Sequence, residues 1–173
     1  MIVGGATMHT SDGIGPIEPA PDLPQRVLLV GSSGGHLAQL LALRPWWEGR
    51  ERTWVTFATQ DAKAHLREEK VVWAYFPTTR NIPNLLRNLV LARGVLRRAR
   101  PDLVVSTGAA VAFPFFLVAR AMRIRTVYLE VYDRLDTRTL TGRLCRPLSS
   151  LFCVQWEEQA ALYKGSHVIG TLL

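Results

Sequence analysis

The stretch that decides the fold is RVLLVGSSGGHLAQLL, residues 26–41. It begins with a short apolar run that ends at a glycine, which is typical of a buried strand. The glycine-rich turn that follows opens a segment in which apolar residues recur at helical spacing. Glycine lets the backbone approach a ligand closely, and the first N–H groups of a helix attract anions. The stretch therefore predicts a turn that holds a phosphate or diphosphate; the alternative is a tight turn without a ligand.

The same alternation of strand and helix continues along the chain. Further strands are predicted at residues 53–59, 71–76, 102–107, 125–131 and 151–155, with a seventh at 167–170. Helices are predicted at residues 36–43, 61–69, 84–98, 109–120 and 137–148. This order predicts the α/β class, with a Rossmann-like doubly wound parallel sheet covered by helices on both faces. Ligands of such sheets bind at the carboxyl ends of the strands, so chemistry is expected in the turns that follow them.

Size and composition allow one domain. The chain has 173 residues, 48% of them hydrophobic, which argues against disorder of the whole chain. No apolar run approaches the roughly 20 residues that span a bilayer. Residues 1–25 are rich in glycine and proline, which predicts a flexible leader ahead of a domain at residues 26–173. Cys145 and Cys153 lie in apolar surroundings without metal-ligand spacing, which predicts buried, reduced thiols in a cytoplasmic protein.

The charge of the chain favours anionic partners. The formal net charge is +7 with histidine neutral, and residues 1–25 contain three acidic side chains and no lysine or arginine, so residues 26–173 carry +10. A basic domain attracts phosphate groups, acidic lipid or nucleic acid. Simple solubility, or a genome that favours arginine over lysine, is the alternative explanation.

Three further features follow predicted strands at the same edge of the sheet. Thr107, Gly108 and Ala109 form a second turn of small residues that opens a helix; close helix–strand packing is the alternative. Glu130 ends an apolar strand, where burying a carboxylate is costly without a task or a partner. It could orient a sugar hydroxyl, act as a base, or pair with Arg134. His36, in the first turn, could cap the helix, contact a phosphate or act as a base.

The helix at 84–98 is predicted to be amphipathic. Leu85, Leu89, Ala92 and Leu96 make the expected core-facing stripe. Apolar residues among arginines on the other side predict a face that touches acidic membrane without crossing it. The residues assigned to this membrane-facing surface are Ile82, Leu86, Val90, Arg93 and Arg97. A solvated arginine face is the alternative, and nucleic acid is not an expected partner, because aromatic side chains are not interleaved with these arginines.

Four motifs carry a resemblance to a known family: VGSSGGHLAQLL (30–41), VVSTGAAVAFPF (104–115), YLEVYDRLDTRTLTGRL (128–144) and LFCVQWEE (151–158). In these motifs and their order, residues 26–173 resemble the membrane-associated subunit of two-subunit glycosyltransferases. That family includes the Alg-fourteen-type subunit of the dolichol pathway and the PssD-type proteins of exopolysaccharide synthesis. One position departs from the family pattern, because Val131 stands where serine is common. The eukaryotic members begin with a transmembrane helix, so this chain is closer to the bacterial, peripheral type.

The resemblance implies a fold, an activity and a partner. The family corresponds to the N-terminal half of a GT-B glycosyltransferase, such as the enzyme that forms lipid II. A separate catalytic subunit would bind the donor: UDP-GlcNAc, UDP-glucuronate or UDP-galactose. The sugar would be transferred, with inversion, to a polyprenyl-diphosphate-linked sugar in exopolysaccharide or lipid-linked oligosaccharide synthesis. The resemblance implies a peripheral location on the inner face of the cell membrane. No cofactor or metal is expected, and the sequence lacks the DxD motif of metal-dependent transferases.

The resemblance also implies roles for individual residues. Residues of both small-residue turns, together with one arginine, would bind the acceptor diphosphate: Ser32, Ser33, Gly34, Gly35, Thr107, Gly108, Ala109 and Arg134. His36 and Glu130 are the candidate catalytic bases, and the sequence does not choose between them. The partner would dock on Trp156 and on the apolar tail, through Ile169, Leu172 and Leu173. A seventh strand of the chain's own sheet is the alternative for the tail.

Two other functions compete with this one. A small NAD(P)-binding oxidoreductase would explain the first glycine turn, and Asp61 could bind a ribose. However, the GxGxxG spacing is missing, and no tyrosine–lysine or cysteine centre is recognisable. The second alternative is a membrane recruiter and activator that takes no part in catalysis.

Overall fold

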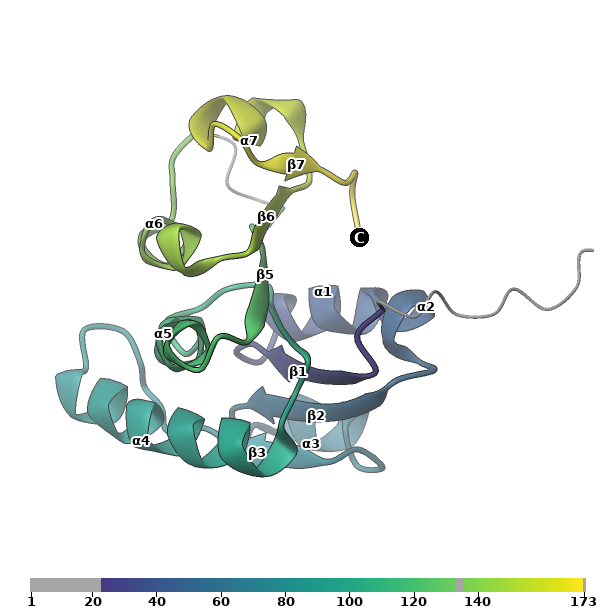
Figure 1. Ribbon diagram of the computed structural model, residues 1–173, viewed down its shortest axis with the longest axis vertical. Coiled ribbons are helices and arrows are strands. Elements are labelled where there is room, and N and C mark those ends of the chain that lie inside the picture. The colour runs from purple at the N-terminus through teal and green to yellow at the C-terminus, as the bar shows by residue number, and fades with distance from the viewer. Residues whose placement is uncertain (1–22, 133–135, 173) are drawn as a thin grey trace, which may run out of the picture.

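The computed structural model describes residues 23–132 and 136–172. It contains a seven-stranded sheet in the order β3-β2-β1-β4-β5-β6-β7, in which every neighbouring pair is parallel (Figure 1). The predicted doubly wound parallel sheet is therefore confirmed. Most of the predicted leader, residues 1–25, lies outside the described residues, as do Arg134 and Leu173.

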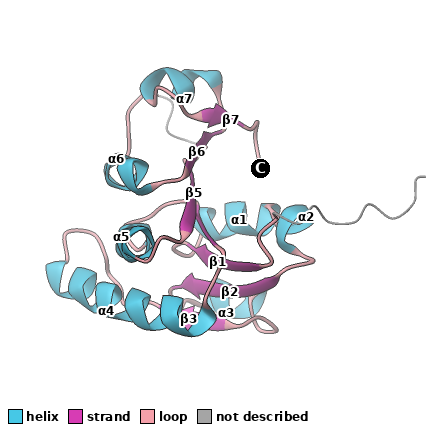
Figure 2. Cartoon of the chain, in the orientation of Figure 1, coloured by secondary structure: helices cyan, strands magenta, loops and turns pink. Residues whose placement is uncertain are grey.

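Strands and helices alternate along the described chain (Figure 2). The strands are β1 (Arg26–Val30), β2 (Glu51–Thr56), β3 (Val71–Trp73), β4 (Leu103–Ser106), β5 (Arg125–Leu129), β6 (Leu151–Val154) and β7 (His167–Val168). The helices are α1 (Gly35–Ala42), α2 (Arg44–Trp47), α3 (Gln60–His65), α4 (Ile82–Ala99), α5 (Ala112–Ala121), α6 (Leu140–Cys145) and α7 (Glu157–Leu162), with a 3-10 turn at Arg146–Leu148.

The core is split by the sheet into two layers. In β1, Leu28 and Val30 pack on the side of α4, α5 and α6, whereas Val27 and Leu29 pack on the side of α1, α2 and α3. Successive side chains of a strand point to opposite faces, so a strand buried on both sides reads as a continuous apolar run. Figure 1 shows α4, α5 and α6 on one side of the sheet and α1 and α2 on the other.

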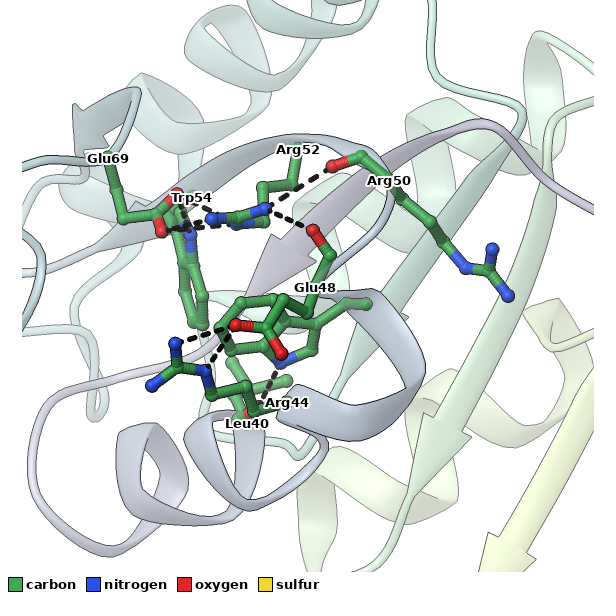
Figure 3. Close-up of polar contacts among 8 residues, drawn as sticks. Leu40, Arg44, Glu48, Arg50, Arg52, Trp54 and Glu69 are labelled. Atoms are coloured by element: carbon green, nitrogen blue, oxygen red, sulfur yellow. Dashed lines mark hydrogen bonds and ion pairs between the residues drawn. The ribbon is translucent and has the colours of Figure 1, made fainter.

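A polar cluster secures the layer that contains α2, near the amino end of β2 (Figure 3). The guanidinium of Arg52 donates to both carboxylate oxygens of Glu69, the closest at 2.6 Å, and it lies over the ring of Trp47. Trp54 donates its indole N–H to the same carboxylate at 3.1 Å. Because this cluster lies away from the carboxyl ends of the strands, we assign it a structural role.

The long helix α4 differs from the prediction in its buried face. It begins at Ile82, and the predicted core residues Leu85 and Leu89 are only half-buried, whereas Asn84 and Asn88 are buried. Asn88 accepts from the backbone N–H of Tyr75 and donates to its carbonyl, at 3.0 and 2.9 Å, and Asn84 donates to the carbonyl of Pro77 at 2.9 Å. The side-chain amides of Asn84 and Asn88 hold the segment between β3 and α4. A hydrophobic pattern does not reveal such polar contacts on the buried face of a helix.

Several element boundaries also differ from the prediction. Most strands end before the predicted residue, because the parallel pairing stops earlier: β3 ends at Trp73 and β5 at Leu129. Strand β2 begins at Glu51, two residues before the predicted start. Pro45 does not simply end a helix: α1 ends at Ala42, and Pro45 lies in the first turn of α2, a position that suits proline. The helix α7 was not predicted. Within the described part of the chain, no helix is long and apolar enough to cross a membrane.

Replacing Asn88 by leucine tests the α4 correction. The variant Asn88→Leu restores the apolar pattern but leaves the N–H and C=O of Tyr75 without their amide partner. We expect the free energy of unfolding to fall by about 1–3 kcal/mol, measured by urea denaturation. Arg93→Leu, at an exposed position of the same helix, should change it by less than about 0.5 kcal/mol. A variant Asn88→Leu as stable as the parent would contradict the assignment.

Candidate functional site

The site lies where the strand order reverses, between β1 and β4. Crossover helices leave these neighbouring strands toward opposite faces of the sheet, which opens a crevice at their carboxyl ends. His36, at the start of α1, and Thr107, just after β4, join the two sides by two hydrogen bonds. The Nδ1 atom of His36 lies 2.7 Å from the carbonyl oxygen of Thr107, and the Thr107 hydroxyl donates to the carbonyl of His36 at 2.8 Å.

The histidine bond fixes the tautomer of the ring. A carbonyl oxygen only accepts hydrogen bonds, so Nδ1 of His36 carries a proton. In the neutral ring, Nε2 is then the nitrogen that can accept a proton. The buried side of the ring is close to Gly108, whose φ is 111°. A Cβ atom at that position would lie 2.9 Å from the hydroxyl of Tyr128 and 3.0 Å from Cε1 of His36, so this turn requires glycine.

The first glycine turn is partly occupied by the chain itself. The N–H of Gly34, which has a φ of 67°, donates to Oδ2 of Asp61 at 3.0 Å. Hydrogen bonds from Thr59 and from Gly34 lower the pKa of the Asp61 carboxyl, so it is ionised near neutral pH. One donor of the predicted anion-binding turn is therefore used to attach α3 to α1.

Glu130 is fully buried at the end of β5 and is held by neutral donors. One oxygen accepts from the Thr139 hydroxyl at 2.9 Å and from the Tyr163 hydroxyl at 2.6 Å. The other accepts from the N–H of Val131 at 3.0 Å. Because three donors compensate for lost water, the carboxylate can remain in the interior. The alternative pairing with Arg134 falls outside the described residues.

Burial and the charge of Glu130 act on its neighbours. Burial, the hydrogen bond to Glu130 and its charge raise the pKa of Tyr163 to about 12. Burial and the same charge raise the pKa of Cys145 to about 12 and that of Tyr128 well above its usual value. These groups therefore stay protonated at neutral pH, and both cysteines are buried free thiols, as predicted.

Three glutamines connect this carboxylate region to α1, α7 and the tail. The Gln155 amide donates to the side-chain oxygen of Gln39 at 2.7 Å and to the carbonyl of Glu130 at 3.0 Å. Its own oxygen accepts from the N–H of Leu172 at 3.1 Å. Gln159 accepts from the N–H of Gln155 at 2.8 Å and donates to the carbonyl of Val131 at 2.6 Å. The four segments are therefore fixed relative to one another.

These elements enclose a pocket of about 270 Å³. Four of the predicted site residues line it, from three different turns: Gly35, His36, Ala109 and Glu130. The other six lining residues were not among those predicted for the site: Gln39, Tyr128, Val131, Tyr132, Thr139 and Thr141. Thr139 and Thr141 stand inside the third family-like motif, and Gln39 inside the first, so motif membership was the only available signal.

The remaining predicted residues lie around this pocket or away from it. Thr107 and Gly108 are buried behind His36 and support it. Ser32, Ser33 and Gly34 lie in the outer part of the first turn and do not line the pocket. The predicted membrane-facing residues are all exposed on α4: Ile82, Leu86, Val90, Arg93 and Arg97. Trp156 is part-exposed and donates its indole N–H to the carbonyl of Tyr132 at 3.0 Å.

The tail continues the chain's own sheet. His167 and Val168 form β7, which pairs with β6, so the alternative of a seventh strand is confirmed for these residues. Ile169 is exposed, and Leu172 is half-buried through its contact with Gln155. In the described part of the chain, the sheet therefore ends in a two-residue edge strand whose side chains, His167 and Val168, are both exposed.

Comparison with protein families decides the relationship. The family described as "Oligosaccharide biosynthesis protein Alg14 like" matches residues 27–172. The chain belongs to this family. The match spans the whole sheet, both small-residue turns and the Glu130 region, and it confirms the resemblance seen in the four motifs.

Named relatives of this Alg14-like chain include transferase subunits and a longer N-acetylglucosamine transferase. The UDP-N-acetylglucosamine transferase subunit ALG14 of Mus musculus is 24% identical over 92% of this chain and 88% of its own length. The protein of the same name from Eremothecium gossypii is 26% identical over 87% of this chain and 81% of its own. An N-acetylmuramyl-(pentapeptide) pyrophosphoryl-undecaprenol N-acetylglucosamine transferase of Aromatoleum aromaticum is 30% identical over 69% of this chain, but only 29% of that protein.

Solved structures show the fold. MurG of Acinetobacter baumannii superposes with a TM-score of 0.70 at 18% identity, over 86% of this chain and 45% of that chain. A UDP-GlcNAc 2-epimerase of Neisseria meningitidis gives a TM-score of 0.64 at 19% identity, over 84% of this chain and 45% of that one. The chain spans about half the length of these structures, and its fold is one Rossmann-like half of a GT-B architecture.

The packing at Gly142 gives a test of the Glu130 cluster. A Cβ atom there would collide with Glu130 and would lie 2.6 Å from the Tyr163 hydroxyl and 2.8 Å from the Thr139 hydroxyl. We expect Gly142→Ala to lower the free energy of unfolding by about 1–3 kcal/mol, because the hydrogen-bonded group must separate. Thermal and urea denaturation would measure the loss.

The matched control is Gly94→Ala in α4, where an added methyl group meets only the end of the Arg98 side chain at 3.8 Å. This substitution should stabilise the protein by about 0.5–1 kcal/mol, since alanine is the better helix former. Equal effects of the two substitutions would show that the cluster around Glu130 is loosely packed.

Proposed function

We propose that this chain is the acceptor-binding, membrane-contacting subunit of a two-component glycosyltransferase. The reaction transfers a sugar from a UDP-sugar to a polyprenyl-diphosphate-linked sugar, and a separate subunit binds the donor. The observation that carries the proposal is the family match over residues 27–172, together with a pocket at the strand-order reversal that is lined by His36 and Glu130. The relatives of similar length are themselves named as transferase subunits, which supports a separate partner.

The pocket suits the polar part of such an acceptor. The start of α1 directs the N–H groups of its first turn toward this edge, and Gly35 lines the pocket. The +10 charge of residues 26–173 attracts an anionic ligand to the domain. In this proposal the diphosphate lies against the starts of α1 and α5, and the sugar lies over Thr139 and Thr141. The hydroxyls and amides of the pocket provide both donors and acceptors for that sugar.

His36 is the better candidate for the catalytic base. Its Nδ1–H is held by Thr107, so Nε2 can accept the proton of the acceptor hydroxyl. As that oxygen bonds to the anomeric carbon of the donor sugar, the bond from this carbon to UDP breaks, and UDP leaves with the electron pair. Attack from the face opposite to UDP inverts the anomeric centre.

Glu130 has a different role in this proposal. Its two oxygens already accept three hydrogen bonds from Thr139, Tyr163 and Val131, and the residue is fully buried. We assign it to positioning: it orders the segment that carries Thr139 and Thr141 at the edge of the pocket.

The exposed face of α4 provides the membrane contact in this proposal. Val90 is 75% exposed, Ile82 68% and Leu86 57%, and Arg93 and Arg97 are exposed along the same helix. Apolar side chains can enter the interfacial region while the arginines attract acidic headgroups. The inner leaflet of the cell membrane, where a polyprenyl-linked acceptor is available, is the proposed location.

The donor subunit is proposed to dock at the carboxyl edge and on the tail. Trp156 and Ile169 present exposed apolar surface close to the end of β6, and the backbone N–H of Leu172 donates a hydrogen bond to Gln155. Gln155 hydrogen-bonds both Leu172 of the tail and Gln39 of the pocket wall, so a partner that contacts the tail would lie near the pocket. Leu173 completes this apolar tail in the sequence.

Sugar transfer by the reconstituted enzyme tests the proposal. The chain alone, and the chain co-expressed with a donor-half protein encoded beside it, would receive a panel of UDP-sugars and a polyprenyl-diphosphate-sugar acceptor. We expect transfer only with both subunits. His36→Ala should lower kcat by about 10²–10⁴-fold, because the proton acceptor is lost. His65→Ala, an exposed histidine at the end of α3, should keep the parent kcat.

Two outcomes would oppose this assignment. Transfer by the chain alone would show that a donor site exists within these residues. A variant His36→Ala with the full turnover of the complex, combined with loss of turnover when the tail is deleted, would favour the recruiter without a catalytic role.

Vesicle binding tests the proposed membrane contact separately. Each arginine near an acidic surface contributes about 1 kcal/mol, so Arg93→Gln with Arg97→Gln should weaken binding to acidic-lipid vesicles about thirtyfold. Val90→Glu should also weaken it, since a charge replaces an inserted apolar group. The control pair Lys63→Gln with Arg67→Gln, on the opposite side of the sheet, should have a much smaller effect, measured by vesicle co-sedimentation. Equal losses for both arginine and control pairs would indicate attraction by net charge alone.

A further inference from the structure

An apolar groove lies next to the polar pocket. It has a volume of about 340 Å³ and runs between the start of α4, the start of α5, and α6. Six apolar side chains form most of its wall: Ile82, Leu85, Phe113, Pro114, Leu140 and Leu144. Figure 1 shows the three helices on the same side of the sheet.

The groove and the pocket adjoin each other and share part of their lining. Thr141 lines both of them, and of the neighbouring residues Ala109 and Ala110, the first lines the pocket and the second lines the groove. A ligand with its polar part beside His36 therefore has an apolar surface in its immediate neighbourhood. Because the polar pocket and the apolar groove adjoin, a ligand that occupies both would be amphiphilic.

The other end of the groove opens on the exposed face of α4. Ile82 lines the groove and is 68% exposed, and Leu86 and Val90 follow it along the same helix. Leu140, at 69% exposed, and Leu144, at 42%, leave apolar surface open on the opposite wall. Arg80 is part of the lining, so a positive charge accompanies the apolar surface. The apolar wall suits a hydrocarbon chain, and the positive charge suits an acidic membrane surface at this end.

We infer that the groove binds the first isoprenyl units of the acceptor, those next to its diphosphate. This inference rests on the proposed function and gives it a specific subsite: the prenyl chain passes from the pocket, between α4, α5 and α6, to the membrane along Leu86 and Val90. The chain is therefore recognised by the protein itself over its first units and is not held by the membrane alone. Binding of these units removes from water the apolar surface that the groove now exposes.

The test separates the groove from the membrane by using soluble ligands without detergent. The full chain is titrated by calorimetry with inorganic diphosphate and with dimethylallyl, geranyl and farnesyl diphosphates below their aggregation concentrations. We expect the affinity to rise about tenfold or more from inorganic diphosphate to geranyl diphosphate, because burial of each further carbon in the groove adds to binding. Farnesol, which lacks the diphosphate, should bind more weakly than farnesyl diphosphate.

Matched leucine variants locate the effect. Leu144→Glu and Leu140→Glu should remove the gain with chain length, so that the prenyl diphosphates bind no better than inorganic diphosphate. Leu151→Glu, a leucine of similar exposure (37%) at the start of β6 and outside the groove, should keep the gain. An affinity that does not depend on chain length, or equal behaviour of Leu144→Glu and Leu151→Glu, would overturn the inference.

Other outcomes distinguish the inference from the proposed function. Transfer by the complete two-subunit enzyme with the same KM for acceptors of one and of three isoprenyl units would overturn the groove and leave the function standing. A clear gain in affinity with chain length, without transfer from any UDP-sugar, would support the groove and overturn the function. A dimer of the parent chain that Leu144→Glu converts to a monomer would show that a second copy covers the groove, and would overturn the inference.

Discussion

The structure depends on the reciprocal hydrogen bonds between His36 and Thr107. Crossovers from β1 and β4 leave toward opposite faces, so the two turns would otherwise border an open crevice. The Thr107 hydroxyl and carbonyl fix both the backbone and the ring of His36, and Gly108 has no side chain to displace that ring. One pair of residues therefore joins the two turns and fixes the tautomer of the imidazole that borders the pocket.

A second group of buried polar contacts ties this crevice to the far end of the chain. Glu130 fixes the segment before α6 through Thr139 and Tyr163, while Gln155 joins Gln39 of α1 to the backbone of Glu130. Buried polar groups are costly unless all are partnered, so such a network favours one arrangement over its competitors. Because Gln155 also holds Leu172, the tail is part of the same arrangement.

Along the surface, polarity changes in a definite order. The pocket beside His36 is lined by hydroxyls, amides and a carboxylate, the groove beside it is lined mainly by leucine, isoleucine, phenylalanine and proline, and the outer face of α4 combines apolar side chains with arginine. A molecule with a sugar, a diphosphate and a hydrocarbon chain has the same order of polarity. The proposed acceptor is thus matched by the whole path, and no single residue decides that match.

The sequence alone determined the layer structure and the edge that carries the chemistry. Buried strands and amphipathic helices have different apolar periods, and glycine turns mark where a strand gives way to a helix, so local patterns sufficed. Only the tertiary structure decided which polar side chains meet. On α4, Asn88 is buried where leucines were expected. The Thr107 hydroxyl donates to the carbonyl of His36, and Gln155 donates to Gln39, which is 116 positions away in the sequence. Such hydrogen bonds depend on distances of tenths of an ångström between elements far apart in the chain, and hydrophobic periodicity carries no information about them.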